Sequence, residues 1–259
     1  LSPTPKTMPP SAPPLPRGSN EDRSDDDVDD DNAVVFVRKR RRSSSSNDGP
    51  SPASPSQTER ALLVAFGCAQ NALGGGLIFG WAGIAGTVLV SPPSLGGAGL
   101  TPDSVTRTFA VSSSLSFVSP LLLGAVLDRY GPRKCMTLSN AIVCLGCASF
   151  ALSRTPLQFC VSASALAFGG PGLQSSLVHL GNLYPRNKNL VMSVVTGTVT
   201  VSFAAFSAFD ALWDGGEGCG FRTMFGWHAA VLAVSTAMSW AVWPDEPYGI
   251  GDGHGDGDG

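Results

Sequence analysis

Six long apolar segments, separated by short polar stretches, dominate the pattern of hydrophobic and polar positions along this chain. A helix needs about 20 residues to cross a hydrocarbon core of about 30 Å, and each segment reaches or approaches that length. The segments are also rich in Gly, Ala and Ser, which let membrane helices approach closely. Their expected bounds are Ala61–Leu89, Phe109–Leu127, Cys135–Leu152, Leu157–Tyr184, Leu190–Trp213 and Phe225–Val242. The pattern predicts an all-α integral membrane protein with six transmembrane helices forming one bundle, and not a soluble helical domain.

The placement of charge divides the chain into three parts. Of 17 Lys and Arg and 20 Asp and Glu residues, only 13 lie between Ala61 and Pro244. Residues 1–60 are rich in Pro and Ser and hold an acidic and a basic run, which predicts a disordered cytoplasmic arm. The basic run, Arg38–Arg42, is interpreted as a cytoplasmic flank, with a nuclear-localisation patch as the alternative. Residues 61–244 are the expected membrane bundle, and residues 245–259 an acidic, Gly-rich, flexible tail.

Lys and Arg are distributed unequally between the two sides of the predicted bundle. One side has the basic arm and two loops that hold Arg129, Arg133, Lys134, Arg186 and Lys188. The loops on the opposite side hold Arg107, Arg154 and Arg222. Because loops rich in Lys and Arg stay in the cytoplasm, this asymmetry predicts that both termini are cytoplasmic. We expect a multi-pass protein of the plasma membrane.

The loop after the second segment, within LLLGAVLDRYGPRK, carries a spaced motif of glycines and charges. Its residues are Gly124, Asp128, Arg129, Gly131, Arg133 and Lys134. The motif resembles a conformational loop of the major facilitator superfamily, in which the Asp lies at the positive end of a neighbouring helix and the basic residues latch one conformation through ion pairs. Gly124 is expected to permit close helix approach, and Gly131 a turn. An ordinary positive-inside loop, the alternative, explains Arg133 and Lys134 but not the spaced glycines or Asp128.

A narrower resemblance covers most of the membrane body. GLIFGWAG, LDRYGPRK, FGGPG, LGNLYP and VWPDEPY occur in an order and spacing similar to those of solute carrier family 43. That family contains L-type facilitative transporters of large neutral amino acids, an equilibrative nucleobase transporter and fungal relatives, built from two six-helix bundles with the solute between them. The resemblance implies that this chain is the N-terminal bundle. Its expected partners are a missing C-terminal six-helix half or a second copy, the lipid bilayer and a small-molecule solute.

Interrupted helices indicate where that solute binds. Gly74-Gly75-Gly76 interrupts the first segment, and Gly169-Gly170-Pro171-Gly172 interrupts the fourth, at matching places in two inverted repeats. Polar residues at helical spacing in the first, fourth and fifth segments indicate a shared wet cavity. The predicted substrate-binding residues are Gln70, Asn71, Gly74, Gly75, Ser175, Ser176, His179, Thr196 and Thr200. The alternatives are a glycine packing seam and hydrogen bonds that only join helices.

The remaining chemistry favours transport over catalysis. No Asp or Glu lies near the middle of a predicted span, which favours facilitated transport (uniport) by alternating access over proton coupling. The resemblance implies a large neutral amino acid (an amino acid uniporter), with a purine nucleobase as the alternative solute. A non-transporting six-span interaction protein is the alternative of another class. No enzyme activity, cofactor, metal site or nucleic-acid partner is predicted.

The six cysteines lack the spacing of a metal site. Cys144 and Cys147 lie in the apolar third segment, where they are interpreted as packing residues. A disulfide between Cys160 and Cys219, both on the predicted outer side, is a further hypothesis.

Overall fold

The structure, a computed structural model, describes residues 55–213 and 219–248 of the chain. The predicted arm up to residue 54 and the predicted tail from residue 249 lie outside the described residues. The described elements, where η marks a short 3-10 helix, are α1 (Gln57–Gly74), η1 (Leu77–Gly80), α2 (Ala82–Ala85), η2 (Pro93–Leu95), α3 (Pro102–Tyr130), α4 (Pro132–Leu152), α5 (Pro156–Ser176), η3 (Val178–Leu183), η4 (Pro185–Asn187), α6 (Lys188–Trp213) and α7 (Phe221–Val242).

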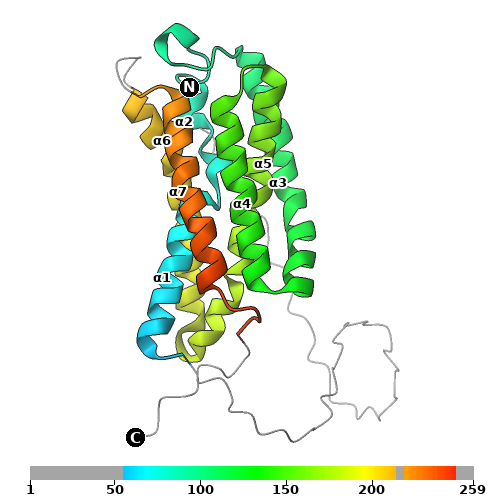
Figure 1. Ribbon diagram of the computed structural model, residues 1–259, viewed down its shortest axis with the longest axis vertical. Coiled ribbons are helices and arrows are strands. Elements are labelled where there is room, and N and C mark those ends of the chain that lie inside the picture. Colours follow the sequence, from blue (N-terminus) through cyan, green and yellow to red (C-terminus); the bar gives the residue numbers. More distant parts are fainter. Residues whose placement is uncertain (1–54, 214–218, 249–259) are drawn as a thin grey trace, which may run out of the picture. The chain divides into compact units, whose positions relative to one another are not determined.

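The long helices lie side by side in one bundle (Figure 1). Helix α5 packs against α3 and α4, and α4 packs in turn against α7. Helix α6 packs along α1, η1 and α2, so the first and fifth apolar segments are neighbours. We call the end of the bundle where α3 passes to α4, at Gly131, the turn end. The end where α4 passes to α5 is the opposite end.

All six predicted segments are mainly helical, but the prediction of six membrane-spanning helices is confirmed only in part. Four described stretches are long and apolar enough to cross a membrane, namely Pro102–Tyr130, Pro132–Leu152, Pro185–Trp213 and Phe221–Val242. Helix α1 has charged residues in its first turn and ends at the first glycine break. Helix α5 holds two glutamines and four serines, and its segment continues into η3 as a 3-10 helix. Polar content and broken regular structure therefore separate these two segments from the other four.

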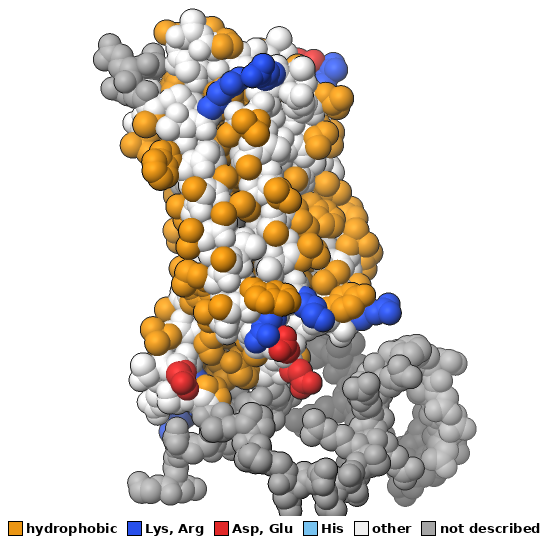
Figure 2. All heavy atoms as spheres, in the orientation of Figure 1, with side chains coloured by type: hydrophobic (Ala, Val, Ile, Leu, Met, Phe, Trp, Pro, Cys, Tyr) orange, Lys and Arg blue, Asp and Glu red, His pale blue; other side chains and the backbone are white. Residues whose placement is uncertain are grey.

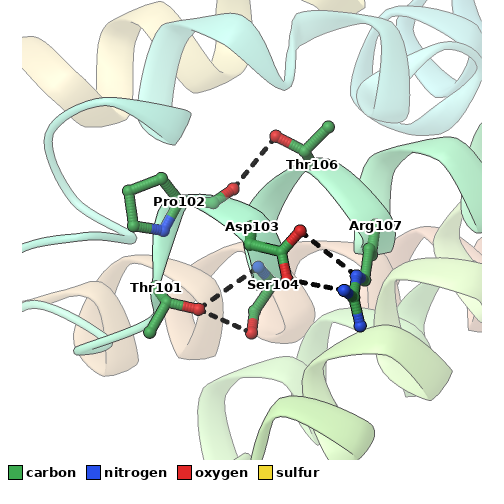
Figure 3. A network of polar contacts seen from close by, with 6 residues as sticks. All are labelled: Thr101, Pro102, Asp103, Ser104, Thr106 and Arg107. Carbon is green, nitrogen blue, oxygen red and sulfur yellow. Dashed lines mark hydrogen bonds and ion pairs between the residues drawn. The ribbon is translucent and has the colours of Figure 1, made fainter.

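Local sequence signals set where the helices begin. Ser56 and Glu59 form a capping box at α1, and Thr155 and Gln158 form one at α5. At the start of α3, the Thr101 hydroxyl accepts a hydrogen bond from the Ser104 backbone N–H at 3.3 Å (Figure 3). Asp103, in the same first turn, forms an exposed ion pair at 2.9 Å with the guanidinium of Arg107, which adds little to stability.

Helices α4 and α5 approach closely because glycines remove side chains from their contact. A Cβ atom at Gly146 would lie 2.9 Å from the backbone nitrogen of Leu166, and one at Gly169 would lie 2.7 Å from the carbonyl oxygen of Ser139. Close contact through small residues is the usual way in which membrane helices associate. Between α4, α5 and α7 the interior is aromatic, with the ring centroids of Phe150 and Phe225 only 4.4 Å apart.

Large apolar side chains cover the outside of the bundle. Phe117, Leu121, Leu157 and Trp227 each expose more than two thirds of their surface. Figure 2 shows hydrophobic side chains spread over the middle of one face, with Lys and Arg gathered near its two ends. An apolar band between two charged ends is the surface expected of a protein that lies in a lipid bilayer.

Candidate functional site

The two predicted glycine breaks meet inside the bundle. Gly74 and Gly75, at the end of α1, lie against Gly170 of α5, where an added Cβ would be 2.7 Å from the Gly75 carbonyl oxygen. On its other side the glycine run faces α6, since a Cβ at Gly76 would lie 2.8 Å from the Ser202 hydroxyl. The first segment therefore passes between α5 and α6 with backbone in contact on both sides. The glycine breaks of the first and fourth segments, which are far apart in sequence, are therefore in contact with each other in the fold.

Gln70 is the centre of a buried polar network that joins α1 to α7. Its amide nitrogen donates to the hydroxyls of Ser235 and Ser239 at 2.9 and 2.6 Å. Its amide oxygen accepts a hydrogen bond of 2.8 Å from the indole nitrogen of Trp243. From α4, the amide of Asn140 also donates to the Ser235 hydroxyl at 2.8 Å. The side chain of Gln70 is thus fully buried and hydrogen-bonded within the bundle.

Asn71, the next residue, turns toward α6. Its amide nitrogen donates to the carbonyl oxygen of Val195 at 2.9 Å and to the hydroxyl of Thr198 at 3.1 Å. Its amide oxygen is buried and accepts no hydrogen bond from the described residues, and it lies directly over Gly75. Because an unsatisfied buried acceptor is costly, this oxygen is the group of the first segment that has most to gain from a further donor.

The predicted polar residues of the fourth segment also lie inside the bundle. Ser175 and Ser176 donate to carbonyl oxygens one turn earlier in their own helix, those of Pro171 and Gly172. His179 is 8% exposed and its ring stacks on that of Tyr248, with 5.4 Å between centroids. These three residues therefore face helix backbone and aromatic rings.

The polar stripe of the fifth segment, by contrast, lies on the surface. Thr196 and Thr200 are exposed on α6, where the Thr200 hydroxyl donates to the Gly197 carbonyl oxygen at 2.7 Å. They belong to a shallow hollow of about 640 Å³ lined by Asn189, Met192, Ser193, Thr196, Gly197 and Thr200. The predicted substrate-binding residues are thus divided between a buried group on α1, α5 and η3 and an exposed group on α6.

At the turn end, the loop motif contacts the segment that follows α7. The guanidinium of Arg133 pairs with the carboxylate of Asp245 at 2.9 Å and also donates to the Trp243 carbonyl oxygen. Gly131 has φ of 84°, and a Cβ atom there would lie 2.0 Å from the carbonyl oxygen of Asp245. Gly131 therefore does provide a turn, as predicted. It also provides space for a neighbouring backbone, which the motif alone does not indicate.

Two other motif residues differ from their expected surroundings. A Cβ atom at Gly124 would meet nothing within 4 Å, so this glycine makes no close helix contact within the described bundle. Asp128 is exposed and forms no ion pair among residues 55–213 and 219–248. The described residues therefore do not make the close approach expected at Gly124.

Sequence reasoning missed several partners of the predicted residues. Ser235, Ser239 and Trp243 complete the Gln70 network, and the ring of Tyr248 stacks on that of His179. The spacing of Ser235 and Ser239, one helical turn apart on α7, is the signal that could have revealed them. Asp245 lies within VWPDEPY, but its contact with Arg133 depends on how the chain folds back after α7.

The cysteines are free. None of the six forms a disulfide, so the hypothesis of a Cys160–Cys219 bridge is wrong for this structure. Cys147 is fully buried and Cys144 partly buried in α4, consistent with packing. Among the described residues, no group of His, Cys, Asp and Glu is arranged to hold a metal ion.

A nearly all-helical bundle with four membrane-length helices and an apolar outer surface defines a multi-pass integral membrane protein. The chain belongs to the Major Facilitator Superfamily, whose family model matches residues 60–256. Members of that superfamily are transporters.

Three proteins of known name are similar in sequence to part of this chain. Protein FMP42 of Saccharomyces cerevisiae is 26% identical over 174 residues, which are 61% of this chain and 34% of that protein. Large neutral amino acids transporter small subunit 3 of Homo sapiens is 25% identical over 142 residues, 52% of this chain and 25% of that protein. Solute carrier family 2, facilitated glucose transporter member 10 of Mus musculus is 28% identical over 175 residues, 63% of this chain and 30% of that protein. The resemblance to solute carrier family 43 is confirmed by the human relative. The chain matches only about a quarter to a third of the length of these relatives.

Proposed function

We propose that this chain is one half of a carrier that moves a large neutral amino acid across a membrane by facilitated, alternating access. Membership of the superfamily supports transport, and the printed names of the human and mouse relatives support the solute class. The name of a further relative, a facilitated glucose transporter, supports movement down a gradient. In this proposal the bundle spans the membrane six times, with the α1–α2 and α5–η3 segments as the two broken spans.

The observation that carries the proposal is the hollow on α6. Its lining is uncharged and presents the hydroxyls of Ser193, Thr196 and Thr200 among apolar atoms, and it lies on the outer surface of the bundle. The Thr200 hydroxyl is bonded within its own helix, but polar side chains without such a bond would be unfavourable against hydrocarbon. The same hollow facing a second bundle would form one wall of a wet cleft. We therefore assign the hollow to the solute pathway.

The buried candidates act behind this wall. Asn71 reaches α6 at Val195, the residue before Thr196, so its amide holds the wall in place and its free oxygen lies near the pathway. Gly74 and Gly75 let the first segment bend beside it. Gln70, Ser175, Ser176 and His179 hold the helices behind the wall and become accessible to solute only when those helices move. In this proposal all the predicted residues take part in transport, but the solute first contacts Thr196 and Thr200.

A second bundle completes the cleft in this proposal. Because the chain matches a quarter to a third of its relatives' length, the other wall is supplied by further sequence of the same protein or by a second copy of this chain. Purified chain reconstituted alone in liposomes should show no saturable leucine uptake if the other wall is further sequence. Saturable uptake together with crosslinking between two copies would instead assign the second wall to a copy.

Removal of single hydroxyls tests the solute site. In the complete carrier, Thr196→Val and Thr200→Val should each raise the half-saturation concentration for leucine roughly tenfold to a hundredfold, the cost of one lost hydrogen bond of about 1–3 kcal/mol. Thr196→Ser should retain most of the affinity because it keeps the hydroxyl. Thr106→Val, at an exposed threonine near the start of α3, is the matched control and should have no effect. Unchanged kinetics in both α6 variants would remove the hollow from the pathway.

The same uptake assay identifies the solute and shows whether transport is coupled to the proton gradient. Leucine or phenylalanine should exchange without a pH gradient, and adenine and glucose should not compete. Competition by adenine alone would select the nucleobase carrier, and competition by glucose alone a sugar carrier. Uptake that disappears when the proton gradient is dissipated would contradict facilitated transport, and no uptake of any of these solutes would favour the non-transporting interaction protein.

We also propose that both termini are cytoplasmic in a plasma-membrane protein. The support is the excess of Lys and Arg on the turn end, at Arg129, Arg133 and Lys134, with Arg186 and Lys188. A cysteine introduced beside Lys188 in a cysteine-free background should react with an impermeant reagent only after the membrane is opened. Reaction in sealed, right-side-out cells would reverse the assignment.

A further inference from the structure

Tyr130 lies between two cations at the turn end. It is the last residue of α3, and the guanidinium carbon of Arg129 lies 5.6 Å from the centroid of its ring. From the first turn of α4, across the Gly131 turn, the ammonium of Lys134 lies 5.7 Å from the same centroid. The ring is about half exposed, at 49%. The fold thus holds two positive groups and one phenol together on the surface.

These two cations are not neutralised by carboxylates of the described part of the chain. The ion pairs found there join Arg107 to Asp103 and Arg133 to Asp245, and neither involves Arg129 or Lys134. Asp128 precedes them in sequence but forms no ion pair with any residue that the structure describes. Two positive charges held at one ring repel each other, and an anion that contacts both would relieve the repulsion. Arg133, the third cation of the turn, is already engaged by Asp245.

The depth of the cluster in the membrane indicates the class of anion that it binds. Helices α3 and α4 are both membrane-length, and Tyr130 and Pro132 are their facing ends, so the cluster lies where hydrocarbon gives way to head groups. One turn deeper on α4, Leu138 is 43% exposed, and two turns deeper on α3, Leu122 is 52% exposed. In Figure 2, cationic side chains lie directly beyond the apolar band at this end of the bundle. Tyrosine is itself enriched at this depth of a membrane.

We propose that Arg129, Tyr130 and Lys134 form a binding site for the phosphate of an anionic phospholipid. The guanidinium can donate two hydrogen bonds to phosphate oxygens, the ammonium adds a mobile point charge, and the phenol O–H is a third donor. The acyl chains lie along the exposed apolar side chains of α3 and α4. A free phosphate would satisfy the charges but would leave that apolar surface unused, so the occupant is a lipid. This site assigns two basic residues of the loop motif to lipid binding, while Arg133 alone forms the ion pair within the bundle.

Native mass spectrometry of the purified full chain in detergent tests the site, with phosphatidylserine and phosphatidylcholine of the same acyl chains as probes. The wild-type chain should bind phosphatidylserine more tightly than phosphatidylcholine. In Arg129→Gln/Lys134→Gln, the affinity for phosphatidylserine should fall roughly tenfold to thirtyfold, with phosphatidylcholine unaffected. Tyr130→Leu keeps the apolar volume but removes the ring face and hydroxyl, so it should give a smaller loss.

The matched control removes two exposed arginines from the opposite end, Arg154→Gln/Arg222→Gln, and should bind phosphatidylserine as the wild-type chain does. An equal loss in this control would show a general effect of charge and overturn the site. Equal binding of the two lipids by the wild-type chain would overturn it as well. Glycerophosphate that displaces phosphatidylserine at equal concentration would identify a free-anion site, which also contradicts the proposal. All of the substituted side chains are exposed, and the elution profile on size-exclusion chromatography reports whether each variant is folded.

Discussion

Arg133 and Asp245 join two distant parts of the chain at the turn end, with 2.9 Å between guanidinium nitrogen and carboxylate oxygen. The Arg133 side chain is 27% exposed and that of Asp245 is 67% exposed, so water screens the pair considerably. Arg133 nevertheless gains further contacts, because its backbone N–H donates to the Pro244 carbonyl oxygen at 3.2 Å. The pair therefore positions the segment after α7 more than it stabilises the fold.

A double-mutant cycle of Arg133→Gln and Asp245→Asn should give a coupling energy of about 0.2–1 kcal/mol in the thermal unfolding of the purified chain. The coupling should decrease as salt is added. Asp103→Asn is the matched control, because Asp103 pairs with Arg107 and should not couple to Arg133→Gln. A coupling energy of zero at low salt would show that the ion pair does not persist in solution.

Gly131→Ala should destabilise the chain more than either of those substitutions. The positive φ of 84° disfavours any L side chain, and the new methyl group would overlap the Asp245 carbonyl oxygen. We expect a loss of about 1–3 kcal/mol and faster proteolysis after Trp243. Gly124→Ala is the matched control, since a Cβ there meets nothing within 4 Å. Equal stability of the two variants would contradict both the positive φ of Gly131 and its contact with Asp245.

Gln70→Leu should lower stability by about 1–3 kcal/mol, because it leaves the buried Trp243 indole N–H without an acceptor and removes one donor from the hydroxyls of Ser235 and Ser239. Trp243→Phe, which removes the indole N–H but keeps an aromatic ring, should cost less than Gln70→Leu. Gln57→Leu, at an exposed position of the same helix, should change stability by no more than about 0.5 kcal/mol. A Gln70→Leu variant as stable as the wild-type chain would contradict the network.

Gly170→Ala should weaken the contact between the first and fourth segments, because the added methyl group would lie 2.7 Å from the Gly75 carbonyl oxygen. We expect a lower unfolding temperature and, in a complete carrier, a lower maximal rate of uptake. Gly226→Ala, on α7, adds the same methyl group into open space. It should be neutral or stabilising by up to about 1 kcal/mol through helix propensity. A reversed order of the two variants would rule out the glycine contact.

The helices of this fold could be predicted from sequence because hydropathy and length report directly on membrane crossing. The apolar segments from Phe109 to Leu152 predict α3 and α4 to within a few residues at the turn, since Pro132 begins a helix and Gly131 ends one. In the first segment, the three consecutive glycines predict an interruption, and α1 does end at Gly74, but hydropathy does not show that the rest of the segment forms η1 and α2. Composition therefore predicts where a span lies, while the continuity of the helix depends on packing.

For the candidate site, the sequence identifies polar residues but not the direction in which they point. Gln70 and Asn71 are adjacent in sequence, yet one bonds to α7 and the other to α6. Both directions follow from the 100° that separates neighbours on a helix, but which neighbour helix lies on each side is set by the tertiary fold. The contact of Asp245 with Arg133 is likewise non-local, and no pattern around either residue indicates the other.

The meeting of Gly75 and Gly170 has a mechanical consequence. Side chains on packed helices normally interlock as ridges and grooves, so that one helix turns against another only by unlocking them. Where two backbones touch without side chains, as they do here, this resistance is absent while the contact distance is kept. The crossing can therefore serve as a pivot, about which the first and fourth segments rotate relative to each other.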